Sequence, residues 1–169
     1  MMTTKKYTFS FTGASALIPE TSVIAEEYNR LKDWNAVRKS LLDKNSLNKI
    51  KQATFAREFR EIKKRLSLLT SDQLNLLVQG SRDEAKSIIL LSLVKTYPFI
   101  KDFITEVLLI KYLIFDNLLT ETDYNKFFNT KILSHNELNA ITESTAKKVK
   151  QRVYTLLEQV GLITQAKNG

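Results

Sequence analysis

The most regular alternation of apolar and polar positions lies between residues 46 and 69. Apolar residues recur there at steps of three and four, the spacing that places side chains on one face of an α-helix: Phe55, Phe59, Ile62, Leu66 and Leu69. The opposite face carries the cations Arg57, Arg60 and Lys64, and Arg65 lies beside them. The pattern therefore predicts an amphipathic helix with a basic outer face.

Residues that begin or end helices divide the rest of the chain. Pro19 stands in the first turn of a helix expected to run to about Lys32, a position where proline is tolerated. Polar residues that favour helix N-termini precede several other apolar segments: Asp33, Ser71, Ser81 and either Thr120 or Thr122. With only 4 Gly and 2 Pro in 169 residues, the chain lacks the turn residues that a β-rich fold needs.

The segment from Lys86 to Leu118 is apolar on nearly all sides and is broken at Tyr97-Pro98. We expect two helices there, which form the buried centre of the molecule. Lys111 and Asp116 interrupt the most apolar part, so no stretch reaches the roughly 20 apolar residues that a membrane-spanning helix needs. The sequence therefore predicts a soluble protein with no membrane contact.

Together these patterns predict an all-α fold, a compact orthogonal multi-helix bundle. We expect residues 1–80 to form an N-terminal helical lobe and residues 81–169 a C-terminal one, either separately or as one compact domain. Tyr7, Phe9 and Phe11 alternate with polar residues, which predicts a short extended segment or strand before the first helix. Such rings could stack on nucleic-acid bases, but a lid over the core is the favoured interpretation.

The formal net charge is +8, and the cations are concentrated in two parts of the chain. Residues 1–70 carry 14 Lys and Arg against 7 Asp and Glu, and residues 131–169 carry 6 against 3. Residues 71–130 carry 6 against 8, so the apolar middle is slightly acidic. Concentrated positive charge is typical of proteins that bind a polyanion, although a solvated surface can have the same composition.

The residues needed for common catalytic and metal sites are scarce. The chain has no cysteine, and His135 is its only histidine, which excludes multi-histidine and cysteine metal sites. A catalytic triad would rest on that one residue, and the four glycines are too far apart for a phosphate-binding loop. We therefore expect no enzymatic activity, no metal and no cofactor. The absence of cysteine also fits the reducing cytoplasm.

Residues 135–163 have the layout of a helix-turn-helix or winged-helix segment. A short helix around Leu138 precedes a polar turn and a longer helix, which Gly161 ends. Four apolar residues of the longer helix form a stripe expected to face the core: Val149, Val153, Leu156 and Val160. Leu162 and Ile163 could begin the strand of a wing, but too few residues follow for a complete one.

The outward face of the longer helix offers groups that contact phosphates and base edges. The candidate DNA-binding residues on it are Ser144, Thr145, Lys147, Lys148, Lys150, Gln151, Arg152 and Tyr154. The cations would contact the backbone, with Gln151 and Tyr154 nearest the bases. Ser144 or Thr145 would begin the helix, whose N-terminal amides can bind phosphate. Arg57, Arg60 and Lys64 could extend this track, although a solvated, non-binding face is the alternative for both sets.

Landmarks spread over nearly the whole chain occur in a recognisable order. They include Ser10-Phe11-Thr12-Gly13, Leu17-Ile18-Pro19-Glu20, Asp33-Trp34-Asn35-Ala36-Val37, Arg82-Asp83-Glu84, Tyr97-Pro98-Phe99-Ile100, Phe127-Phe128 and Ser144-Thr145-Ala146-Lys147-Lys148. In this order the sequence resembles the BrxA family of BREX (bacteriophage exclusion) defence systems. The resemblance implies a small helical component of a multi-protein system that restricts phage and marks host DNA by methylation. It also implies binding to double-stranded DNA without enzymatic activity.

We therefore expect a sequence-tolerant binder of double-stranded DNA in the cytoplasm. The resemblance supplies no functional residues, so the candidate residues come from helix geometry alone. One alternative is a protein–protein adaptor that holds larger BREX proteins together, such as the methyltransferase or the ATPase, without touching DNA. The aromatic N-terminal segment and the apolar middle motivate it. A second alternative is an RNA binder, which composition does not separate from a DNA binder.

Overall fold

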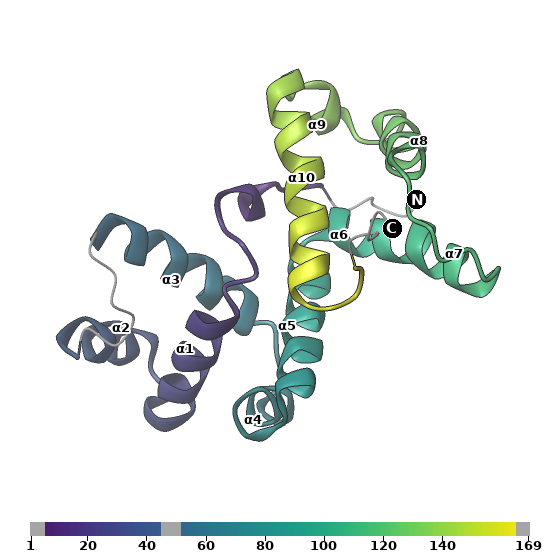
Figure 1. The fold of residues 1–169 in the computed structure, drawn as a ribbon. Coiled ribbons are helices and arrows are strands. Elements are labelled where there is room, and N and C mark those ends of the chain that lie inside the picture. The colour runs from purple at the N-terminus through teal and green to yellow at the C-terminus, as the bar shows by residue number, and fades with distance from the viewer. Residues whose placement is uncertain (1–5, 45–51, 165–169) are drawn as a thin grey trace.

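A run of helices passes through the middle of the molecule: α5 (Arg82–Thr96), α6 (Pro98–Phe103), η2 (Ile104–Leu108) and α7 (Leu109–Leu113) (Figure 1). The computed structural model describes residues 6–44 and 52–164. The predicted N-cap of α5 is confirmed, because the Ser81 hydroxyl accepts a hydrogen bond from the Glu84 N–H. The predicted break is also confirmed, since Tyr97 is extended and Pro98 begins α6. η2 continues α6 as a short π-helical stretch.

Helices from the first part of the chain pack on one side of this run: α1 (Ile18–Leu31), α2 (Trp34–Asp43), α3 (Gln52–Leu66) and α4 (Ser71–Gln79). Asp33 caps α2 as predicted, accepting a hydrogen bond from the Ala36 N–H at 2.7 Å. Thr70, and not Ser71, caps α4, because it forms a reciprocal pair of hydrogen bonds with Gln73. The predicted start of α3 at residue 46 lies outside the described residues.

Helices from the last part of the chain lie on the other side: α8 (Glu121–Ile132), α9 (Asn136–Asn139) and α10 (Glu143–Gln159) (Figure 1). Thr120 caps α8, since its hydroxyl accepts from the Asp123 N–H. Residues 6–44 and 52–164 contain no strand, so the predicted all-α class is confirmed. Buried side chains from both halves form one continuous core, and the division into two lobes at residue 80 stays a prediction.

The N-terminal aromatic residues are part of this core. Tyr7 and Phe11 are buried, Phe9 is half-buried, and the rings of Tyr7 and Phe9 meet Phe99 edge to face at 5.2 and 5.4 Å. The segment is not a strand, because η1 (Ser10–Gly13) is a 3-10 turn that places these rings against α6. The lid interpretation is therefore confirmed, and the rings are not free to stack on bases.

The prediction that the apolar segment is buried as far as Leu118 is wrong beyond η2, whose apolar side chains are half-buried against the core. The core includes side chains of α5 and α6: Ile89, Leu93, Phe99, Ile100 and Phe103. Large apolar side chains of α7 and the residues after it are exposed: Leu109, Ile110, Tyr112, Leu113, Ile114, Phe115 and Leu118. The difference arises because α7 extends to the edge of the molecule (Figure 1), where the other described helices do not cover it.

Candidate nucleic-acid interface

Helix α10 has one buried face and one exposed face. The predicted core stripe is confirmed, and Leu157 joins it: Val149, Val153, Leu156, Leu157 and Val160 are all buried. Ser144, Lys147, Lys148 and Gln151 are exposed. Because these four residues stand at i, i+3, i+4 and i+7, they form one continuous outward stripe. The buried side holds the helix in place while the outward side meets solvent.

Two of the α10 cations have carboxylate partners. Lys147 pairs with Glu143 at 2.8 Å, and both side chains are largely exposed. Lys150 is more enclosed: it pairs with Glu121 at 2.7 Å and lies over the ring of Tyr124. This hydrogen bond from Lys150 lowers the pKa of Glu121. Lys150 therefore lies on the flank of α10 that faces α8, away from the outward stripe.

The other two cations have no ion pair with any carboxylate of residues 6–44 and 52–164. Lys148 is exposed and belongs to the outward stripe, and Arg152 is half-buried on the opposite flank from Lys150. Lys148 is therefore the cation of α10 most available to a phosphate.

The N-terminus of α10 differs from the prediction. Thr142 caps the helix, not Ser144 or Thr145, and its hydroxyl accepts a hydrogen bond from the Thr145 N–H at 3.2 Å. The hydroxyls of Ser144 and Thr145 lie 3.0 and 2.9 Å from that of Thr142. Both candidate hydroxyls are therefore engaged in the cap, and Ser144 remains at the exposed end of the outward stripe.

Tyr154 does not point outward beside Gln151 as predicted. Its side chain is half-buried, its hydroxyl donates to the Thr120 carbonyl oxygen at 3.3 Å, and its ring packs against Phe103 and Tyr124. Burial raises the pKa of the Tyr154 phenol. Gln151 faces solvent, whereas Tyr154, three residues later on α10, lies on the flank that packs against α8.

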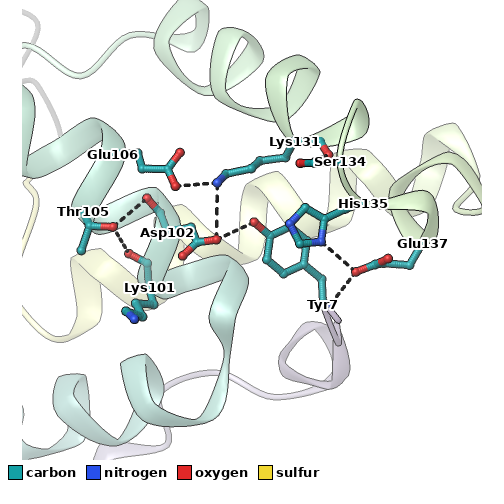
Figure 2. A network of polar contacts seen from close by, with 9 residues as sticks. All are labelled: Tyr7, Lys101, Asp102, Thr105, Glu106, Lys131, Ser134, His135 and Glu137. Atoms are coloured by element: carbon teal, nitrogen blue, oxygen red, sulfur yellow. Dashed lines mark hydrogen bonds and ion pairs between the residues drawn. The ribbon is translucent and has the colours of Figure 1, made fainter. Parts of the chain in front are cut away.

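The short helix α9, which precedes α10, is held by the N-terminal segment (Figure 2). The Tyr7 N–H donates to Glu137 at 2.5 Å, and the Tyr7 ring stacks on His135 with centroids 3.7 Å apart. His135 Nδ1 lies 3.1 Å from the same carboxylate. Burial opposes ionisation of Glu137, but these hydrogen bonds lower its pKa. His135, the one histidine on which a catalytic triad would rest, is thus a buried residue that packs against Tyr7.

A second set of contacts ties α8 to the central run of helices (Figure 2). Lys131 pairs with Glu106 at 2.5 Å and with Asp102 at 3.4 Å. The Tyr7 hydroxyl donates to Asp102 at 2.7 Å, which joins the two sets. The carboxylates of Asp102 on α6 and Glu106 on η2 therefore hold α8 directly. Through Tyr7, Asp102 also helps to hold α9, which precedes α10.

The chain after α10 does not form a strand in the described residues. Gly161 adopts a left-handed backbone with φ of 80°, and the N–H groups of Leu162 and Ile163 donate to the Leu157 carbonyl oxygen. This is the hydrogen bonding of a helix C-terminal cap, which glycine favours. The described residues, up to Thr164, thus contain no wing.

The second candidate set lies on α3, where Arg57, Arg60 and Lys64 are exposed. Lys64 donates to the Ser10 hydroxyl at 3.1 Å and lies over the Tyr97 ring. Helices α3 and α10 lie on either side of η1 (Figure 1). Lys64 of α3 donates to Ser10 of η1, and the Ala16 N–H, just after η1, donates to Gln159 of α10 at 2.9 Å. Within the described part of the chain, no hydrogen bond or ion pair links the two basic sets directly.

Arg65 is a residue that sequence reasoning misplaced. Helical spacing predicts that Arg65 lies beside the exposed cations of α3, but its side chain is only 1% exposed. Its guanidinium donates to the Tyr97 hydroxyl at 3.0 Å and to the Ser15 carbonyl oxygen at 3.0 Å. Arg65 therefore serves the fold, and it is excluded from any nucleic-acid surface.

Residues 6–44 and 52–164 contain neither a cluster of metal ligands nor a membrane-spanning helix. No group of three or more His, Asp or Glu side chains there could hold a metal ion. None of the helices in the described part of the chain combines the length and the apolar character needed to cross a bilayer.

Comparison with known proteins gives consistent matches. The BrxA family model matches residues 5–169. A "BREX protein BrxA" of Escherichia coli O9:H4 (strain HS) is 24% identical over 151 residues, covering 89% of this chain and 71% of that protein. Another "BREX protein BrxA", from Bacillus cereus (strain H3081.97), is 27% identical over 103 residues, covering 61% of this chain and 52% of that protein.

The fold is shared with a solved structure. The crystal structure of an uncharacterized protein from Magnetospirillum magneticum superposes with a TM-score of 0.81 at 21% identity, covering 96% of this chain and 83% of that one. Since the family model covers nearly the whole chain and both relatives carry the family's name, the chain belongs to the BrxA family of BREX phage-defence systems.

Proposed function

We propose that this protein is a non-enzymatic component of a BREX system that acts in the cytoplasm and binds double-stranded DNA through α10. The observation that carries the proposal is the outward stripe of that helix. Lys147, Lys148 and Gln151 are exposed there, opposite a fully buried face. Because the buried face fixes the helix, the outward cations and the amide keep a constant spacing, as backbone positioning on a duplex requires.

The ion pair at Lys147 does not prevent this role. Lys147 and Glu143 are both largely exposed, and exposed ion pairs contribute only about 0–1 kcal/mol. A phosphate can therefore replace Glu143 as the partner of Lys147 at little cost. Lys148 needs no such exchange, and the net charge of +8 attracts the duplex over a longer range.

The experiment is a fluorescence anisotropy titration of a labelled DNA duplex with the wild-type protein and a charge-reversal variant. Lys147→Glu combined with Lys148→Glu should weaken binding to any duplex at least about tenfold, because phosphate contacts carry no sequence information. Neither side chain is buried, so the fold should be unchanged, and circular dichroism checks this.

A matched control separates a local effect from a change in total charge. Arg38→Glu combined with Lys39→Glu reverses two adjacent exposed cations on α2, at the far side of the molecule from α10 (Figure 1). We expect this control to keep most of the wild-type affinity. Equal weakening by both double variants, or no binding by the wild type, contradicts the proposal.

The alternative is an adaptor that joins larger BREX proteins without touching DNA. The observation that favours it is the pairing of Lys147 and Lys150 with carboxylates, which reduces the free positive charge of α10. Co-purification with the methyltransferase or the ATPase that survives nuclease and high salt, together with no affinity for duplex DNA, supports the adaptor. Competition by duplex RNA in the same titration tests the RNA-binding alternative.

A further inference from the structure

A groove lies between the later part of the central run of helices and the end of α10. Its volume is about 780 Å³, and its lining comes from three parts of the chain: η2 with α7, the residues from Asp116 to Leu119, and the last turns of α10 with the residues that follow them. We name this recess the η2–α10 groove. The outward-stripe residues of α10 do not line it, so it is separate from the candidate DNA-binding surface.

The groove exposes large apolar side chains. Leu109 and Tyr112 of α7, together with Leu118 and Leu162, line it and are between 41% and 72% exposed. Apolar side chains scattered singly over a surface are ordinary, but a group of them in one recess is typical of an interaction site. Each gains free energy when a partner removes it from water. These four positions therefore favour a partner that covers them.

The helix at one wall of the groove has an unusual backbone. Ile104 and Leu108, the first and last residues of η2, both line the groove, and η2 is π-helical. Such stretches are rare and occur frequently at functional sites. The ion pair between Glu106 of η2 and Lys131 of α8 holds this wall in place. The groove is therefore formed before any partner arrives, which lowers the cost of binding.

The charged groups at the groove have a negative balance. Lys111 is the one cation among the lining residues, and it pairs with Asp116 at 2.5 Å and with Asp123 at 3.1 Å. Glu158 adds another carboxylate to the lining. One cation is thus set against three carboxylates, in a chain whose net charge is +8. Charge complementarity favours a basic partner here and disfavours a nucleic acid.

The form of the groove indicates which kind of basic partner it fits. Sites for small molecules enclose most of the ligand's surface, whereas four apolar side chains of this lining remain at least 41% exposed. An extended peptide needs the edge of a sheet to pair with its backbone, and residues 6–44 and 52–164 contain no strand. A helix satisfies its own backbone groups and can lay one apolar face into a groove.

We propose that the η2–α10 groove binds an amphipathic helix of another protein, whose apolar face covers Leu109, Tyr112 and Leu162. Basic residues on the flank of that helix lie near Asp116 and Glu158. The proposal does not rest on DNA binding, because the outward stripe lies elsewhere on α10. The protein can therefore hold a duplex and a partner helix at the same time.

Two synthetic peptides of equal length test the groove. Both carry leucines at steps of three and four, and the opposite face carries lysines in one peptide and glutamates in the other. Fluorescence anisotropy of each labelled peptide, titrated with nucleic-acid-free protein, should show at least about tenfold tighter binding of the lysine peptide. A net charge of +8 attracts the glutamate peptide at long range, so a preference for lysine has to arise locally.

Variants of the lining place the binding at the groove. Leu109→Gln puts an amide against the peptide's leucines and should weaken lysine-peptide binding at least about fivefold. Glu158→Lys reverses a charge of the lining and should weaken it by a similar factor. Leu133→Gln and Glu26→Lys are the matched controls, because both residues are exposed and neither lines the groove. They should bind like the wild type, and circular dichroism checks that every variant is folded.

The outcomes separate this inference from the proposed function. Binding of neither peptide, equal affinity for both, or equal weakening by the groove variants and their controls overturns the inference. Tighter binding of the glutamate peptide also overturns it and assigns the groove to an acidic segment. A protein that binds the lysine peptide at the groove but does not bind duplex DNA contradicts the proposed function and leaves this inference standing.

Discussion

The ring of Tyr7 stacks on the imidazole of His135, with centroids 3.7 Å apart and ring planes 12° apart. The contact joins the N-terminal segment to the residue before α9, and the Tyr7 N–H bonds Glu137 within that helix. Since α9 leads directly into the turn before α10, the first described residues of the chain fix the start of the candidate DNA-binding helix.

The first prediction concerns this contact. Tyr7 is 2% exposed, and truncation of a buried aromatic side chain typically costs about 3–5 kcal/mol. Tyr7→Ala should therefore lower the free energy of unfolding by an amount in that range, measured by urea denaturation. Tyr7→Phe keeps the ring and loses only the hydrogen bond to Asp102, so it should cost about 1–2 kcal/mol. Equal stability of Tyr7→Ala and the wild type contradicts this role.

The second prediction concerns Arg65 and Tyr97. Arg65→Ala removes a large buried side chain and leaves the Ser15 carbonyl without its hydrogen bond, so it should lower the free energy of unfolding by about 2–5 kcal/mol, measured by thermal denaturation. The Tyr97 hydroxyl also donates to Glu61. A double-mutant cycle of Arg65→Met and Tyr97→Phe should show a coupling of at least about 0.5 kcal/mol. Additive effects would show that the two side chains do not act together.

The third prediction is a pH dependence of stability that arises from Glu27. Hydrogen bonds from Arg30 and then from Ser40 lower the pKa of Glu27 from 4.5 to about 2, although burial opposes the shift. The carboxyl therefore holds its proton more weakly in the folded protein than in the unfolded chain. Its stabilising contribution is complete above about pH 4.5 and is lost as the pH falls toward 2.

Glu27→Gln removes the titrating group and should flatten this part of the profile. Urea denaturation of both proteins at neutral pH and across the acidic range measures the difference. The same acid-dependent loss in the variant and in the wild type would assign the effect to other carboxyls.

The fourth prediction concerns the partner of Lys147. Glu143→Gln removes a negative charge next to the outward stripe and frees Lys147. It should therefore tighten DNA binding a few-fold at low salt, and the gain should disappear at high salt because the effect is electrostatic. Anisotropy titrations at two salt concentrations measure it. Weaker binding by Glu143→Gln would indicate that the ion pair itself positions the contact.

Local patterns in the sequence were sufficient for part of the structure. Asp33, Ser81 and Thr120 cap helices because the hydrogen bond that defines a cap involves residues only three apart. The buried stripe of α10 follows from the period of Val149, Val153 and Leu156. These features depend on the chain within one or two turns of the residue concerned.

The remaining features depend on distant partners. Arg65 is buried because the Tyr97 hydroxyl and the Ser15 carbonyl lie where its guanidinium reaches them, and its own helix carries no signal of this. Tyr154 turns toward Thr120 for the same kind of reason. Apolar composition predicted a buried α7, but only the position of neighbouring helices decides that Phe115 remains exposed.

The most direct test of the central claim is the salt dependence of duplex DNA binding by the wild type and by Lys148→Ala. Each phosphate contact contributes about −0.9 to the slope of log affinity against log salt. We expect a steep negative slope for the wild type and a slope shallower by about one contact for Lys148→Ala. An affinity that does not change with salt, or a Lys148→Ala slope equal to that of the wild type, contradicts DNA binding through α10.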